Sequence, residues 1–280
     1  MKQVIFSADD FGLSEAVNEG IERAHRDGIL RSASLMVAAP AAADAVRRAR
    51  SMPGLRVGLH LVVIEGPAVL PPAEIPELVN AAGQFPSDQL RLGVRYFFRS
   101  AVRAQLAAEI RAQFAAFAAT GLPLDHANAH KHMHLHPTVG ALLLRIGRTF
   151  GLRAVRVPAE PASVLADCGT RTGTGDHLLN RWTDLLRWQA RRAGMVTNDH
   201  CFGLAWTGGM TADRLVRLAA HLPDGVSEVY FHPAAARDPL LDRLMPAYQH
   251  EGEMQALLDP AVDAAFRTAG AQSTTYHALG

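Results

Sequence analysis

The sequence predicts an α/β protein, a single (β/α) barrel of seven or eight mostly parallel strands that resembles a TIM barrel. Short β-rich runs alternate with longer helical patterns along the chain, which is typical of parallel strands joined by crossover helices. The length of 280 residues suits one barrel. Several apolar runs also end in polar residues, as expected where a barrel carries its active site. We therefore expect one domain over residues 1–280, with a long insertion at about residues 62–100.

The individual elements follow from local pattern. Ser14 is a typical helix N-cap, and the helix after it places Val17, Ile21 and Ala24 on one face before Gly28 ends it. Pro137 suits the first turn of another helix. The expected strands cover residues 4–6, 34–37, 55–57, 125–127, 154–157, 227–231 and 273–276. The other expected helices cover residues 41–50, 102–119, 137–150, 176–194 and 211–220.

Composition excludes several classes of function. The chain has 28 Lys and Arg against 27 Asp and Glu, so nothing in its charge argues for nucleic acid as a partner. No apolar run is long enough to span a bilayer, and the N-terminus does not resemble a signal peptide. We expect a cytoplasmic protein, at most peripheral to a membrane. Cys168 and Cys201 lack metal-site spacing and are expected to be free thiols.

Polar residues at strand ends are the first candidates for a site. Asp9 and Asp10 directly follow the first strand, and two adjacent buried carboxylates are costly unless a cation or hydrogen bonds compensate them. A single Asp there would more simply cap the next helix. His60 and His232 also follow apolar runs, although a lone His at a strand end is commonly a hydrogen-bonded core residue.

A histidine run is the most unusual feature of the chain. Five histidines lie between His126 and His136, and four of them alternate with other residues from His130 onward. An extended chain would place those four on one face, whereas a helix would split them. Neighbours on such a face are roughly 6.5–7 Å apart and can share one ion, so the run predicts one or two metal ligands. Five other histidines are expected to be surface or packing residues: His25, His177, His221, His250 and His277.

Together these residues favour one divalent ion held by a carboxylate and two histidines, with positions left for water and substrate. A second carboxylate can take a proton from the bound water, and an imidazole opposite can protonate a leaving group. This combination suits hydrolysis of an amide or ester.

Four short motifs, in this order, resemble the YdjC-like carbohydrate deacetylases. They are Ala8-Asp-Asp-Phe-Gly12, Gly58-Leu-His60, the run from His126 to His134, and Glu228-Val-Tyr-Phe-His-Pro233. The resemblance implies a (β/α) barrel that removes an acetyl group from an N-acetylated sugar with one divalent metal ion, Mg²⁺ or Zn²⁺.

Residue by residue, the resemblance implies the roles of the site. Asp10, His60 and His130 match the metal ligands, Asp9 matches the general base and His232 the general acid. His132 and His134 match histidines near the substrate. The chain departs from the family pattern in carrying Ala234 after the His-Pro element and Asn128 where an Asp is common.

A narrower likeness concerns the substrate. Residues 34–40, 109–121 and 124–137 resemble the branch associated with hopanoid biosynthesis, HpnK. That likeness implies N-acetylglucosaminyl bacteriohopanetetrol as the substrate, in preference to a soluble chitooligosaccharide such as diacetylchitobiose.

Aromatic residues in the insertion bear on a lipid-linked substrate. Tyr96, Phe97 and Phe98 are flanked by arginines, and this pattern suits either an apolar lip with a basic rim at a membrane surface or plain core packing. Phe97 and Phe98 are therefore candidate substrate contacts. Arg156, at the end of its strand, is expected to bind substrate, to orient Asp9 or to form a structural ion pair.

Two other classes of function fit part of the pattern. Metal-dependent phosphoesterases and amidohydrolases also place His and Asp at barrel strand ends, but they usually assemble more ligands. A non-catalytic metal-binding protein would use the histidine run alone, which leaves Asp9, Asp10, His60 and His232 unexplained.

Overall fold

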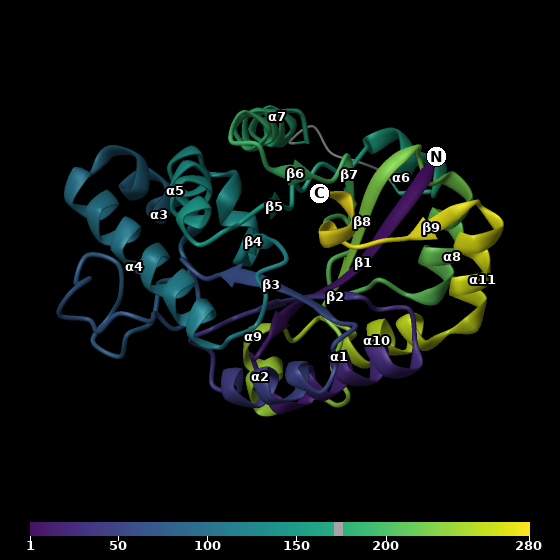
Figure 1. Ribbon diagram of the computed structural model, residues 1–280, viewed down its shortest axis with the longest axis horizontal. Helices are drawn as coiled ribbons and strands as arrows, with labels where there is room; N and C mark the ends of the chain where they lie inside the picture. The colour runs from purple at the N-terminus through teal and green to yellow at the C-terminus, as the bar shows by residue number, and fades with distance from the viewer. Residues whose placement is uncertain (171–175) are drawn as a thin grey trace.

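A curled parallel sheet forms the centre of the computed structural model, which describes residues 1–170 and 176–280 (Figure 1). Its strands follow the order β6-β5-β4-β3-β2-β1-β8-β7, and β9 pairs with β1 outside this path. Every strand pair is parallel. The strands are β1 (Lys2–Phe11), β2 (Ser32–Leu35), β3 (Arg56–Leu61), β4 (Ala127–Ala129), β5 (Ala154–Val155), β6 (Val196–Thr197), β7 (His200–Phe202), β8 (Gly225–Phe231) and β9 (Ala271–Ser273).

The two ends of this sheet are joined by the chain itself. Only Asn198 and Asp199 separate β6, which pairs with β5, from β7, which pairs with β8. The Asn198 side chain accepts the Val157 N–H at 2.7 Å and donates to the Val157 carbonyl at 2.8 Å, in place of ladder bonds. The Cys201 N–H then donates to the Ala159 carbonyl at 2.9 Å. The sheet is therefore barrel-like, and the predicted α/β, TIM-barrel-like class is confirmed.

Helices lie on the outside of the sheet (Figure 1). Helix α1 begins as predicted, because the Ser14 hydroxyl accepts the Val17 N–H and the face with Ile21 and Ala24 is buried. The helices are α1 (Glu15–Asp27), α2 (Ala42–Arg50), α3 (Gln89–Phe98), α4 (Ser100–Ala119), α5 (Pro137–Thr149), α6 (Ala162–Asp167), α7 (Asp176–Arg192), α8 (Ala212–His221), α9 (Pro239–Leu244), α10 (His250–Leu258) and α11 (Pro260–Thr268). None of the described helices is long and apolar enough to cross a bilayer.

Of the two conformations considered for the histidine run, the structure does not show the extended one. After the three residues of β4 the chain enters a 3₁₀ helix, η1 (His130–Leu135), in which Lys131 and His132 have φ values of 49° and 52°. Two left-handed residues in succession reverse the chain direction locally, so the rings do not share one face. Between β3 and α4 the expected long insertion contains α3 and irregular chain.

The last ten residues close the end of the barrel opposite the strand termini that carry the site. Strand β9 pairs with the first residues of β1, and the 3₁₀ helix η2 (Tyr276–Leu279) follows. Tyr276 is buried, stacks on His126 and donates its hydroxyl to Glu228 Oε2 at 2.6 Å. Of the expected strand at 273–276, only Ser273 lies in β9, because the chain after it turns inward to place the Tyr276 ring.

Candidate active site

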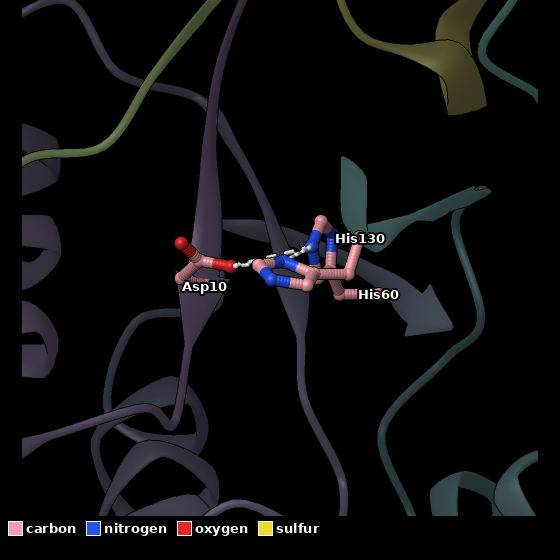
Figure 2. Close-up of side chains that lie close together, drawn as sticks. All are labelled: Asp10, His60 and His130. Atoms are coloured by element: carbon pink, nitrogen blue, oxygen red, sulfur yellow. Dashed lines mark hydrogen bonds and ion pairs between the residues drawn. The ribbon is translucent and has the colours of Figure 1, made fainter. Parts of the chain in front are cut away.

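Three predicted residues from three strand ends converge at one point. Asp10 belongs to β1, His60 to β3, and His130 follows β4 (Figure 2). Asp10 Oδ1 lies 3.3 Å from His60 Nε2 and 3.3 Å from His130 Nδ1, and the two ring nitrogens are 3.3 Å apart. Among the described residues, this is the group whose ligand atoms are close enough to hold one metal ion.

The local backbone at the end of β1 places the Asp10 carboxylate. Asp10 has φ 63° and Gly12 φ 96°, and the pairing of β1 with β2 shifts register between Ala8 and Phe11. Asp tolerates the left-handed region better than most side chains do, and Gly adopts it freely. This irregularity turns Asp10 away from Asp9 and towards the two rings.

The Asp10 carboxylate is buried without the hydrogen bonds that a buried charge normally accepts. The residue is 2% exposed, yet neither of its oxygens has a hydrogen-bond partner. Burial by itself would raise the pKa of Asp10, but the rings of His130 and His60 outweigh burial and hold this pKa well below its usual range. An ionised carboxylate without partners beside two imidazole nitrogens fits a cation that completes the group.

A hydrogen bond fixes His60 in the tautomer whose Nε2 carries no proton. Its Nδ1–H donates to Asn128 Oδ1 at 2.8 Å, which leaves Nε2 with a lone pair directed at the cluster. Asn128 also donates from Nδ2 to Asp9 Oδ1 at 2.9 Å. A carboxylate at position 128 would repel Asp9, whereas the amide supplies an acceptor to His60 and a donor to Asp9 at once.

Asp9, by contrast, is fully paired. Its carboxylate accepts two bonds from Arg156, at 2.6 and 2.9 Å, and one from the Ser34 hydroxyl at 2.9 Å. Burial would raise the pKa of Asp9, but the charge of Arg156, followed by that of His60, holds it well below the usual range. Asp9 is therefore ionised at neutral pH.

Arg156 is the centre of this buried ion-pair network. It is completely buried, donates to Glu228 Oε1 at 2.8 Å as well as to Asp9, and lies over the Tyr230 ring at 4.6 Å. It does not line the cavity beside the cluster. Of the three predicted roles, the position of Arg156 fits two: it orients Asp9 and it forms a structural ion pair, with Glu228 as well as Asp9.

A cavity of about 810 Å³ opens over the Asp10, His60 and His130 cluster. Asp9, His132 and His232 also line it, together with a mostly apolar wall. The apolar lining consists of Leu13, Met36, Ala38, Pro40, Pro67, Phe85, Ala129, Leu204, Leu240, Leu244 and Met245. Polar side chains reach it from Glu65, Gln84, Lys131, Thr207, Arg243 and Tyr248.

Backbone strain concentrates around this cavity. Among the described non-glycine residues, four have positive φ: Asp10, Glu65, Lys131 and His132. All four line the cavity, and an ion pair joins Lys131 to Glu65 across its edge. Strained residues of this kind cluster at functional sites, so the cavity itself is the candidate active site.

His232 directly follows β8, and two side chains form hydrogen bonds with its backbone. Its N–H donates to Glu253 Oε2 at 2.5 Å, and its carbonyl accepts the His250 ring N–H at 2.7 Å. Its own Nδ1 has no partner. Burial lowers the pKa of His232, and the charges of Asp10 and Asp9 oppose this. Burial also raises the pKa of Glu253 to about 7.

The other histidines of the run have separate surroundings. His132 lines the cavity, with Nε2 3.0 Å from the Tyr230 hydroxyl. His134 is buried outside the cavity lining and donates from Nε2 to the Arg156 carbonyl at 3.0 Å. His126 is buried against Asp125, and His136 lies beside Phe97. Only His130 from the run therefore belongs to the cluster.

Sequence reasoning missed the residues that support the site. His250, expected to be an ordinary packing or surface residue, bonds the His232 carbonyl; the His177 side chain lies outside the described residues. Glu228 and Tyr230 alternate with the predicted His232 along β8, and a charged residue inside an apolar strand was the available signal. Tyr276 and Glu253 carry no such signal, because their partners are distant in sequence.

Comparison with known proteins identifies the family. A family model described as YdjC-like protein matches residues 3–268. The chain belongs to the YdjC-like family. This YdjC-like chain is 32% identical over 274 residues to a carbohydrate deacetylase of Geobacillus stearothermophilus, covering 97% of this chain and 96% of the relative. It is 30% identical over 281 residues to a carbohydrate deacetylase of Brevibacillus brevis, covering 99% of this chain and 100% of the relative.

A solved structure shows the same fold. A protein of Enterococcus faecalis, described as a candidate cellobiose-phosphate cleavage protein, superposes on the YdjC-like chain with a TM-score of 0.78. The match covers 100% of this chain and 99% of that chain at 23% identity. The family predicted from the four motifs is thus confirmed.

Proposed function

We propose that the protein is a metal-dependent N-deacetylase that hydrolyses the acetamide of an N-acetylglucosamine-containing substrate. The observation that carries this proposal is the unpartnered Asp10 carboxylate, which meets His60 and His130 at the floor of a cavity. The carbohydrate deacetylases among its relatives support an acetylated sugar as the substrate.

The ligand atoms suit a divalent ion bound by nitrogen and oxygen. Three corners of a tetrahedron with metal–ligand bonds of about 2.0–2.1 Å would lie roughly 3.3–3.4 Å apart, and the three ligand atoms here are 3.3 Å apart in each pair. Two imidazoles favour Zn²⁺ over Mg²⁺, which prefers oxygen ligands. When bound, the ion would acidify a water molecule and stabilise negative charge on the acetamide oxygen.

Asp9 is proposed to accept the proton of the attacking water. Its low pKa keeps it ionised and makes it a weak base, so its strength as a proton acceptor would depend on the acidity that a cation held by Asp10, His60 and His130 would give to water. Arg156 and Ser34 hold its carboxylate in one orientation at the edge of the cavity. This arrangement gives the base a fixed position and keeps it ionised.

His232 is proposed to protonate the departing sugar nitrogen, because an amine is a poor leaving group without a proton. The ring lines the cavity and its Nδ1 is unpartnered. Burial lowers the pKa of His232 while Asp10 and Asp9 favour its charged form, so the protonated ring gives up its proton more readily than an exposed imidazole does. His132 is proposed to contact the substrate beside it.

The apolar wall supports a lipid-linked sugar as the substrate. A sugar alone offers little apolar surface, whereas Met36, Leu240 and Met245 line the cavity together with other apolar side chains. We favour N-acetylglucosaminyl bacteriohopanetetrol, the substrate implied by the likeness to the hopanoid-associated branch. The enzyme would then work in the cytoplasm, peripherally at the inner membrane face, with Phe97 and Phe98 near the lipid.

Two alternatives remain distinct from this proposal. The first is a soluble chitooligosaccharide as the substrate, which is compatible with relatives described as carbohydrate deacetylases. A non-catalytic metal-binding role is less well supported, because His126 and His134 are buried with partners inside the protein.

The deciding experiment is acetate release from two substrates, N-acetylglucosaminyl bacteriohopanetetrol and diacetylchitobiose, by the metal-loaded protein. We expect release from both, with the larger kcat/KM for the lipid-linked sugar. The Asp9→Asn variant should bind metal and release at least about a hundredfold less acetate, because general-base catalysis typically contributes 10²–10⁴. Full activity in Asp9→Asn would exclude the base assignment, and acetate from neither substrate would exclude the deacetylase.

A further inference from the structure

Exposed apolar side chains gather on two helices. Among the described residues, eight large apolar side chains are exposed, and six of them lie on α3 or α7. On α3 they are Leu90, Val94, Phe97 and Phe98, and on α7 they are Trp182 and Trp188. Singly exposed apolar residues need no explanation, but a concentration of them does.

The α3 residues form one continuous stripe. Positions 90, 94, 97 and 98 have the spacing that places side chains on the same helix face, and Leu90 and Phe98 are 80% and 74% exposed. Tyr96 points the other way, because it is buried and donates its hydroxyl to the Val63 carbonyl at 2.6 Å. The helix is thus fixed by its inner face, while its outer apolar face is largely exposed and contacts another element through Phe97, which lies against His136.

Arginines surround Trp188 on α7. Arg192 lies over its ring at 4.9 Å, and a hollow between α5 and α7 is lined by Trp188, Arg192, Arg145 and Arg148 without any carboxylate. An adjoining hollow adds Arg187 and Arg191; Asp184 lines this hollow, and Asp199 Oδ1 lies 3.9 and 3.8 Å from the two arginines. An exposed indole among arginines is the composition of a membrane interface, where the ring sits at headgroup level and the cations meet phosphates.

The two patches lie on neighbouring helices. Helix α5 contacts both α3 and α7, and Phe97 lies against His136 at the start of α5, with ring centroids 6.1 Å apart. Arg145 and Arg148 are near the other end of α5. A helix of this length is about 20 Å long, so one bilayer patch is large enough to meet both.

We propose that the face formed by α3, α5 and α7 docks on an anionic lipid bilayer, with the α3 stripe entering the apolar boundary and the arginines binding headgroup phosphates. A second copy of the chain fits this face less well, because a two-fold pairing would bring the same arginine-rich patch opposite itself. The docking surface rests on the proposed function for its purpose, since a lipid-linked substrate is met at a bilayer, but binding is measurable without catalysis.

The test is co-sedimentation of the full chain with vesicles of phosphatidylcholine alone or mixed with phosphatidylglycerol. We expect binding to the mixed vesicles that weakens as salt is raised. The Arg145→Gln/Arg148→Gln variant should bind roughly 25-fold more weakly, about fivefold for each lost charge. Phe97→Ser/Phe98→Ser should also lose binding.

Matched controls come from the α8 and α11 side of the molecule (Figure 1). Arg217→Gln/Arg267→Gln removes two exposed arginines, and Val216→Ser removes an exposed apolar side chain; both should bind vesicles like the wild type. Equal binding to neutral and anionic vesicles, or equal losses in the control variants, would overturn the proposal. So would a dimer in solution that Phe97→Ser/Phe98→Ser dissociates, since a second copy would then cover the stripe.

The same arginine variant separates this proposal from the deacetylase. Arg145→Gln/Arg148→Gln should release acetate from soluble diacetylchitobiose at the wild-type rate. Lost vesicle binding with intact acetate release supports the docking surface as a separate feature. A wild-type protein that releases acetate but ignores anionic vesicles overturns the docking surface alone, and one that binds vesicles but releases no acetate overturns the function alone.

Discussion

Two layers of buried charge lie next to each other at the strand ends, and they differ in completeness. In the lower layer, Asp9 and Glu228 share Arg156, and their oxygens accept further hydroxyl hydrogen bonds. In the upper layer, Asp10 faces two imidazoles and its oxygens have no hydrogen-bond partner. Asp9 and Asp10 are adjacent in the sequence, yet the oxygens of Asp9 are hydrogen-bonded within the lower layer and those of Asp10 have no hydrogen-bond partner in the upper layer. The upper layer, whose carboxylate lacks hydrogen-bond partners, is therefore the one expected to bind a ligand.

The largest expected effect comes from removing an upper-layer ligand. Asp10→Ala and His130→Ala should each lose the metal ion and lower acetate release at least about a thousandfold, because a catalytic cation contributes several kcal/mol to the transition state. Metal content after dialysis and acetate assays check this. His136→Ala, from the same run, should keep both metal and activity. One tightly bound ion in Asp10→Ala would contradict the proposed ligand set.

Breaking the lower layer should instead affect stability. Arg156→Met leaves two carboxylates buried without their cation and should lower the free energy of unfolding by about 3 kcal/mol or more. Denaturant unfolding measures it, with the exposed Arg267→Met as the control, expected within about 0.5 kcal/mol of wild type. An Arg156→Met protein as stable as the wild type would mean that the network is not what holds these carboxylates.

A smaller, pH-dependent effect should come from His134, which joins the histidine run to Arg156. Burial, followed by the charge of Arg156, lowers the pKa of His134 to about 3. The unfolded ring titrates near pH 6.5, so it binds a proton more readily than the folded one, and folding stability must fall as the pH drops from about 6.5 towards 3.

His134→Gln keeps a donor for the Arg156 carbonyl and removes this titration. The loss of unfolding free energy between pH 7 and pH 4.5 should therefore be about 2–3 kcal/mol smaller in the variant, at about 1.4 kcal/mol for each pH unit. Urea unfolding at the two pH values checks this. Parallel pH dependence in the two proteins would show that His134 titrates normally when folded.

The fold and the two layers differ in how far sequence predicts them. Short-range periodicity and the Ser14 cap predict much of the strand and helix order. They do not predict β6 and β7, because strands of two and three residues are too short to show a period. The Asp10, His60 and His130 grouping is also predictable, since parallel strands bring their carboxyl ends together. Within the histidine run, only the likeness to the family points to His130, because spacing along an extended chain does not describe a 3₁₀ helix.

The lower layer could not be predicted in the same way. Its contacts join residues far apart in the chain, such as Tyr276 with Glu228 and Arg156 with Asp9, and no local pattern encodes such pairs. Asn128 looked like a departure from the family pattern, yet its amide bonds both His60 and Asp9. Whether an amide or a carboxylate serves at that position depends on the charges around it, which only the folded chain reveals.

The left-handed residues around the cavity have a consequence for how the protein can change over evolution. Non-glycine residues in that conformation each cost of order 1–3 kcal/mol, and Glu65, Lys131 and His132 all carry it at the cavity edge. A total of this size is comparable to the whole stability margin of many domains. Favourable contacts in the rest of the barrel must therefore offset this strain. Glycine at these positions would relieve the strain and stabilise the fold, but it would leave the shape of the opening less defined.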